Sequence, residues 1–128
     1  MAKDVIARDV AEEEVQGWCE QFKITLDLES RERIVTTLMA GRITFDEKNE
    51  AFSIQLRKPI HLDNGEIVDS LKIEEADARQ IKEANKVKDE FEKSLRLLSS
   101  ISGQPLGVLD RIKQKDLLLL GDMFNFFG

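Results

Sequence analysis

The side chains able to perform chemistry are few, since the chain has one histidine, one cysteine and no tyrosine. His61 and Asp63 form an H-x-D pair, whose side chains point to the same face if both lie on a strand. A carboxylate so placed can orient an imidazole as a general base or hold one edge of a metal site. In period-two alternation His61 lies on the face opposite Leu62, toward solvent, which favours a structural histidine. A small enzyme that uses His61 is therefore the least favoured alternative.

The other reactive side chains also have a structural explanation that is favoured over a chemical one. Glu74, Glu75 and Asp77 could bind a divalent cation, but three acids at a helix start more often complement the helix dipole. Cys19 stands alone, so it forms no intramolecular disulfide, and beside Trp18 it is typical of a small buried residue. The sequence contains no GxGxxG, P-loop, GxSxG or HExxH motif. We therefore expect no catalytic residues, no metal, no cofactor and no enzymatic activity.

Composition and charge favour a protein partner. The 128 residues carry 25 Asp and Glu against 19 Lys and Arg, a net charge of -6, and the basic residues are scattered. Nucleic-acid sites match phosphates with basic groups, so we expect neither nucleic acid nor an anionic membrane as the partner. No apolar run reaches signal-peptide or membrane-spanning length, which predicts an intracellular protein. The length predicts a single domain over residues 1–128.

Three regions must position these side chains. Residues 1–41 form a helical N-terminal extension: apolar residues recur at helical spacing from Asp4 to Phe22, with Trp18 on the apolar side, so we expect this helix to be docked. A second helix follows, with Asp27 or Ser30 as its N-cap and Gly41 as its stop.

Residues 42–73 change to period two and predict a small antiparallel β-hairpin sheet. Asn64-Gly65 favours a two-residue type I′ turn, which would place Leu62 opposite Ile67 and require a bulge or strand end near Ile60. Pro59 has no amide hydrogen for a sheet ladder, so it should end its strand or lie on an edge.

Residues 74–128 return to helical spacing. From about Glu75 a seven-residue repeat predicts one long helix on the sheet, or a short coiled coil, and Gly103 and Pro105 should end it. We expect this helix to pack on the sheet residues Ile43, Phe45, Ile54 and Leu56 through Ile81, Ala84, Phe91, Leu95 and Leu98. A short helix around Val108 and a final apolar helix follow. The predicted class is α+β, with helices packed on a small sheet.

The final helix, over about 116–127, carries apolar residues around nearly its whole circumference, leaving mainly Asp122 and Asn125 to face water. One flank can cover the sheet. The other flank is more apolar than a small surface helix requires. It therefore either enters the core or binds a second copy of the chain or a client segment. We take the candidate partner-binding residues to be Leu118, Leu119, Met123, Phe124, Phe126 and Phe127.

The order of strand, proline, Asn-Gly hairpin, acidic helix start, long helix, Gly-x-Pro break and leucine-rich last helix resembles the tail assembly chaperone family of long-tailed bacteriophages. The similar stretch runs over residues 56–120, and the first 40 residues extend beyond the family's short N-terminus. The residues that carry the resemblance are Leu56, Pro59, Leu71, Ile73, Asp77, Leu97, Ile101, Gly103, Pro105, Leu109 and Asp116.

This resemblance implies a non-enzymatic chaperone in the cytoplasm of a bacterial host. Such a protein would bind the tape measure protein and help the tail tube protein polymerise around it. It would be encoded by a phage or prophage, and self-association into a homo-oligomer would be compatible with its apolar last helix. The main alternative is a structural subunit that stays in the finished tail or in another particle.

Overall fold

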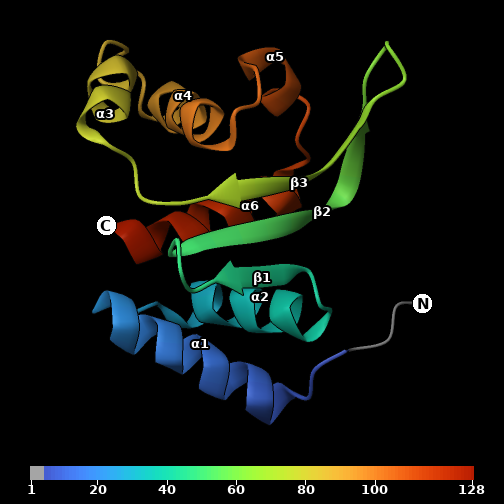
Figure 1. Ribbon diagram of the computed structural model, residues 1–128, viewed down its shortest axis with the longest axis vertical. Coiled ribbons are helices and arrows are strands. Elements are labelled where there is room, and N and C mark those ends of the chain that lie inside the picture. Colours follow the sequence, from blue (N-terminus) through green and yellow to red (C-terminus); the bar gives the residue numbers. More distant parts are fainter. Residues whose placement is uncertain (1–4) are drawn as a thin grey trace.

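The computed structural model describes residues 5–128 and has an α+β fold (Figure 1). Two N-terminal helices precede a three-stranded antiparallel sheet, and the C-terminal half is helical, as the sequence predicted; that half holds four helices where three were expected. The elements, in chain order, are α1 (Arg8–Phe22), α2 (Leu28–Met39), β1 (Ile43–Asp46), β2 (Ala51–His61), β3 (Ile67–Ile73), α3 (Ala78–Ala84), α4 (Glu90–Ser102), α5 (Leu106–Leu109), α6 (Gln114–Phe124) and the 3₁₀ turn η1 (Asn125–Phe127).

The N-terminal helices are docked. α1 ends at Phe22 as predicted but begins at Arg8, so residues 5–7 lie outside the helix that was expected to include them. α2 starts after the predicted cap Asp27 and ends before the predicted stop Gly41. The carboxylate of Asp27 accepts a hydrogen bond from the amide of Ser30 at 2.8 Å, which caps α2. Gly41, just beyond α2, has a φ of +75°, a conformation that glycine adopts without strain. Trp18 is buried and meets Phe52 of β2 edge-to-face, with ring centroids 5.0 Å apart. The prediction that α1 is a docked part of the fold is therefore confirmed.

The sheet has the order β1-β2-β3, and its hairpin differs from the predicted one by one residue. His61, not Leu62, lies opposite Ile67. The amide of Gly65 donates to the carbonyl of Leu62 at 3.0 Å, and the amide of Leu62 donates to the carbonyl of Glu66 at 2.8 Å. Gly65 has a φ of +91°. The turn is thus a three-residue loop with glycine at its left-handed position, and the two-residue type I′ turn was wrong.

The predicted irregularity near Ile60 is present, because the register of β2 and β3 shifts between Gln55 and Ile60. Pro59 lies inside this irregular stretch and does not end β2, which continues to His61. Since its missing amide hydrogen falls where the ladder is already interrupted, proline is tolerated there.

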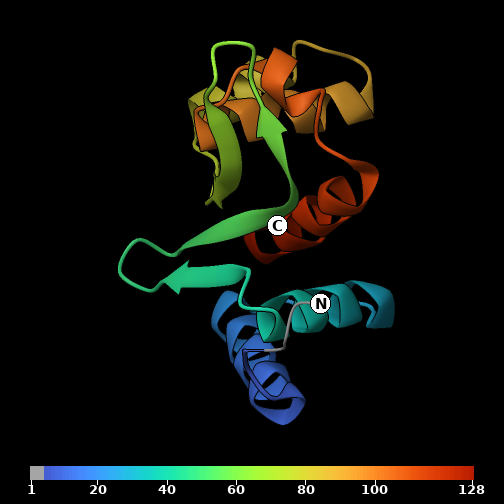
Figure 2. The same cartoon turned by 90° about the vertical axis from the view of Figure 1, so that its right-hand side faces the viewer.

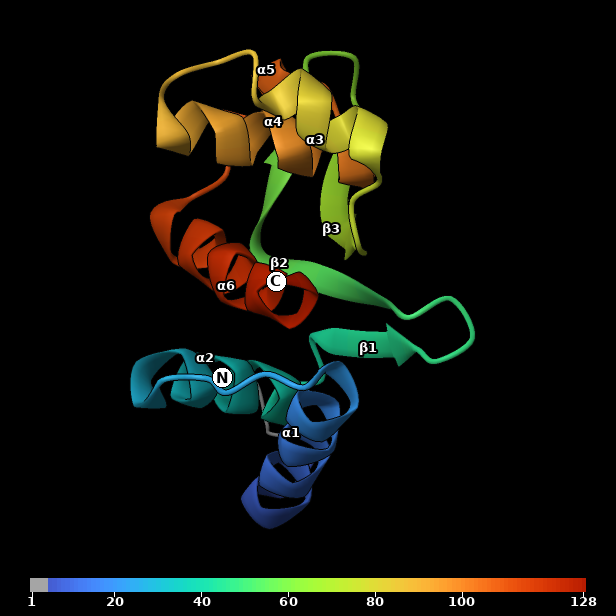
Figure 3. The same ribbon diagram turned by 90° about the vertical axis from the view of Figure 1, so that its left-hand side faces the viewer.

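The predicted long helix is two helices. α3 ends at Ala84, and α4 begins after Asp89, whose side chain accepts the amide of Glu92 at 2.9 Å. The chain folds back between them, so α3 lies beside α4 (Figure 3). This break removes two predicted core residues, because Ile81 and Phe91 are exposed, whereas Ala84, Leu95 and Leu98 are buried. Gly103 ends α4 as predicted.

The elements form three tiers (Figure 2). α1 and α2 lie at one end, α3, α4 and α5 at the other, and the sheet and α6 occupy the middle. α6 therefore has neighbours on two sides. One cluster of buried apolar side chains runs through all three tiers, from Ala11 to Phe126.

Candidate functional site

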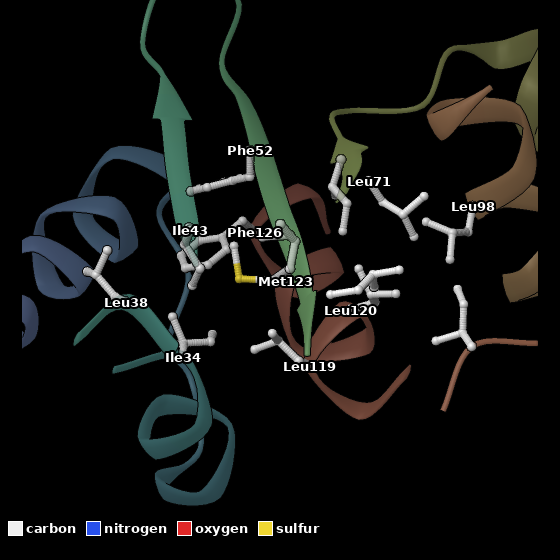
Figure 4. Packing of buried hydrophobic residues seen from close by; sticks show 14 of the residues in the cluster. Ile34, Leu38, Ile43, Phe52, Leu71, Leu98, Leu119, Leu120, Met123 and Phe126 are labelled. Carbon is white, nitrogen blue, oxygen red and sulfur yellow. The ribbon is translucent and has the colours of Figure 1, made fainter. Parts of the chain in front are cut away.

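α6 buries much more of its surface than a helix at the edge of a fold. Leu119 and Met123 of α6 and Phe126 of the following turn η1 are buried and belong to the same cluster as Phe52 and Ile43 (Figure 4). Leu120 is also buried, and in Figure 4 it lies on the side of α6 nearer Leu98. α6 carries apolar side chains around most of its circumference because it is packed between two tiers of helices.

This burial corrects the predicted partner-binding surface. Leu119, Met123 and Phe126 lie in the core and are not accessible to a partner in the folded chain. Leu118 is exposed, and Phe124 and Phe127 are half-buried, so these three remain available.

Asp122 was expected to face water and is instead buried. Its carboxylate accepts hydrogen bonds from the hydroxyl of Ser30 at 2.8 Å and from Nε and Nη2 of Arg33 at 2.6 and 2.9 Å. These bonds raise the pKa of Arg33 above its ordinary value, because the neighbouring carboxylate favours the charged guanidinium. The residues come from α2, so this cluster attaches α6 to the N-terminal helices.

A groove lies between α4 and α6 and is the strongest candidate for a functional site. It has a volume of about 480 Å³, and its buried residues include Leu95, Leu98 and Leu120. Two large apolar side chains in its lining are exposed: Phe91 at 57% and Leu118 at 47%. The remaining lining residues are Ser94, Gln114, Leu117, Gly121, Asp122 and Phe124.

A second cavity of about 650 Å³ continues this surface toward η1. It shares Ser94, Gly121 and Phe124 with the first, and Leu97, Ile81 and Phe127 add apolar walls. Ile81 is 46% exposed. We call the two together the α4–α6 groove. The contiguous exposed apolar side chains, set between helical walls, are suited to an apolar helix or an extended apolar segment.

Sequence reasoning found Leu118, Phe124 and Phe127 but assigned Phe91 and Ile81 to the core. The aspartate before Phe91 is the one local signal of the break, since Asp89 is a strong N-cap residue followed by acidic Glu90 and Glu92. Because α4 begins at Glu90, Phe91 lies in its first turn. The buried residues of α4 come later, from Leu95 onward.

The residues first singled out for chemistry lie outside the groove or at its end. His61 is exposed at the end of β2, and Asp63 is in the hairpin turn. Glu74 and Glu75 line the second cavity, and Asp77 forms a capping box with Gln80 at the start of α3. Cys19 is buried, and this desolvation raises the pKa of its thiol. Across residues 5–128 no three metal-ligating side chains of the His, Cys, Asp or Glu type are gathered.

None of the helices in the described range combines the length and the apolar character that crossing a membrane requires.

Comparison of the chain with models of protein families, with curated proteins and with solved structures found no match.

Proposed function

We propose that this protein is a non-enzymatic assembly chaperone of a bacteriophage tail, which holds an apolar helical segment of the tape measure protein in the α4–α6 groove. The observation that carries the proposal is the exposure of Phe91 and Leu118 on facing walls of one apolar groove. Large apolar side chains are seldom left together in water without a partner, and an apolar groove between helices can take the apolar face of an amphipathic helix.

The resemblance to tail assembly chaperones supplies the identity of the client. Several residues that carry it have defined structural roles here. Asp77 caps α3, Gly103 ends α4, and Pro105 precedes α5. These roles support the resemblance at the level of cap and turn positions over residues 56–120, whereas the single long helix of the resemblance is two helices here, α3 and α4. The tail tube protein would then be the component whose polymerisation the bound tape measure protein directs.

The test is co-purification with the tape measure protein encoded by the same phage or prophage. The double variant F91S/L118S should reduce the amount recovered about tenfold, because it removes two exposed apolar side chains from the groove, equivalent to about 1.4 kcal/mol. The matched control is L28S/I67S. It removes two apolar side chains that are 86% and 55% exposed elsewhere in the fold. Both variants should keep the wild-type thermal melt.

Three results would count against the proposal in distinguishable ways. If the wild-type chain recovers no tape measure protein, the proposed client is wrong. If F91S/L118S recovers as much as the control, the groove is not the binding site. If the protein is found in purified, finished tails, it is a structural subunit and not a chaperone that leaves.

A further inference from the structure

The fold gathers basic side chains that lie in two separate stretches of the sequence. One stretch is the bend of β2 at residues 57–58, and the other is the start of α6 with the loop before it, residues 110–116. They lie side by side (Figure 2), because the carboxylate of Asp116 accepts the backbone amides of Arg57 and Lys58. We call the exposed cations of the two stretches the basic patch: Arg57, Lys58, Arg111, Lys113 and Lys115.

The positive charge of the basic patch is not cancelled within the fold. Asp116 is already paired with Arg42, whose Nη2 lies 3.1 Å from its carboxylate. Among the described residues, no ion pair engages a cation of the patch. Asp110 is the one other acidic residue in the two stretches, and it is exposed. The patch is therefore a local excess of positive charge on a chain whose net charge is -6.

The basic patch borders the α4–α6 groove. Gln114, which stands between Lys113 and Lys115 in the sequence, lines the groove. Lys115 precedes the exposed groove residue Leu118 by three positions, and side chains three apart on a helix are neighbours on its surface. A segment that contacts Leu118 therefore lies within reach of the patch.

We propose that the basic patch binds carboxylate side chains of the segment held in the groove, an inference that rests on the function proposed above. The bound segment is then an apolar helix with acidic residues where it passes the start of α6. Lysine and arginine form charge-assisted hydrogen bonds with carboxylates, and they repel a segment that carries basic residues at the same place. The groove supplies apolar contact, and the patch selects among apolar segments by their charge.

An acidic protein segment fits this surface better than a nucleic acid does. A nucleic acid brings a long row of phosphates onto a protein with 25 acidic residues against 19 basic ones, so its affinity is opposed outside the patch. The patch also adjoins the apolar side chain of Leu118, which is 47% exposed. An apolar helix with acidic ends uses both surfaces, whereas a phosphate backbone uses only one.

The test uses two synthetic helical peptides that share one leucine-rich apolar face. They differ only in carrying glutamates or lysines at both ends, so the comparison does not depend on the direction of binding. Fluorescence anisotropy of the labelled peptides measures their dissociation constants in about 0.1 M salt, where the screening length is about 10 Å. The wild-type chain should bind the glutamate peptide at least about tenfold more tightly. Its net charge of -6 alone favours the lysine peptide, so this preference requires a local basic surface.

Three double variants separate the patch from the groove. K113E/K115E should abolish or reverse the preference for the glutamate peptide. The matched control K23E/K48E has the same net charge and should keep the preference, because its two exposed lysines lie at the end of α1 and in the turn between β1 and β2. F91S/L118S should weaken the binding of both peptides by a similar factor. The preference of the wild-type chain should also shrink in about 1 M salt, where the screening length is about 3 Å.

The failure of this inference differs from the failure of the groove. If the wild-type chain binds both peptides equally, or if K113E/K115E keeps the preference, the patch does not select acidic segments and the groove still stands. If neither peptide binds, the groove does not hold apolar helices and this inference falls with it. If a labelled oligonucleotide binds more tightly than the glutamate peptide at the same salt, the patch is a nucleic-acid surface and the inference is wrong.

Discussion

Two buried aspartates of α6 show how single side chains fix the position of the whole helix. Asp122 binds Ser30 and Arg33 of α2, as described above. Asp116 binds the segment of β2 that extends beyond β1: its carboxylate accepts the amides of Arg57 and Lys58, both at 3.0 Å, and Nη2 of Arg42 at 3.1 Å. The carboxylate thus satisfies backbone donors that lack a strand partner at this position.

Asp116→Ala should lower the free energy of unfolding by about 3–5 kcal/mol, because it removes the acceptor of two backbone amides and of the partly buried Arg42 guanidinium. Urea denaturation measures this loss. The control is Asp110→Ala, an exposed aspartate a few residues earlier, which should change stability by less than about 0.5 kcal/mol. A loss below about 1 kcal/mol for Asp116→Ala would show that water replaces these bonds.

Among the elements, α4 differs most from its expected environment. Sequence periodicity places Phe91, Leu95 and Leu98 on one stripe, and we expected all three to contact the sheet. Only part of this stripe is buried. α4 packs against β3, and its buried residues Leu95 and Leu98 lie beyond its exposed first turn, which carries Phe91 (Figure 3). Periodicity therefore identified the apolar face of α4 but not the part of that face left for a partner.

Leu98→Ala should lower the free energy of unfolding by about 2–5 kcal/mol, since it removes buried methyl groups and leaves a cavity. Phe91→Ala should change it by less than about 1 kcal/mol, because most of that ring already contacts water. Urea melts of the two variants under one set of conditions make the comparison. Equal large losses would place Phe91 in the core and remove a wall of the proposed groove.

At the scale of the whole molecule, the three tiers share α6 and one apolar core. The N-terminal helices bury one side of α6 and of the turn η1 that follows it: α2 packs against α6, and Trp18 of α1 meets Phe126 of η1 with ring centroids 6.1 Å apart. The C-terminal helices cover another side near Leu120. Neither end tier buries all its apolar surface without the middle one, so we expect the tiers to unfold together.

Trp18 fluorescence and far-UV circular dichroism should accordingly give the same transition midpoint in urea. Trp18, the one tryptophan of the chain, reports on the N-terminal tier, while the dichroism follows helices in every tier. Native emission should be blue-shifted and move to the red during that single transition, because the indole is buried. Two separated midpoints would mean that α1 and α2 unfold as an independent unit.

Local chemistry in the sequence determined much of the fold. The change of period marked the helical and strand regions, Asp27 and Gly41 bounded α2, and Gly103 ended α4. These features depend on neighbouring residues, through backbone sterics, capping and alternation, and are therefore readable along the chain. The candidate partner residues Leu118, Phe124 and Phe127 could likewise be found from the excess of apolar side chains on the last helix.

Only the tertiary structure decided which of those apolar side chains are covered. Met123 and Phe126 are buried in the apolar core, Phe91 remains exposed, and Asp122 is paired with Arg33, 89 residues away in the sequence. An apolar or charged residue has the same local pattern whether its neighbour in space is solvent, a distant helix or another protein. Burial depends on contacts between segments far apart in the chain, so the sequence pattern could indicate an apolar surface but not its final neighbour.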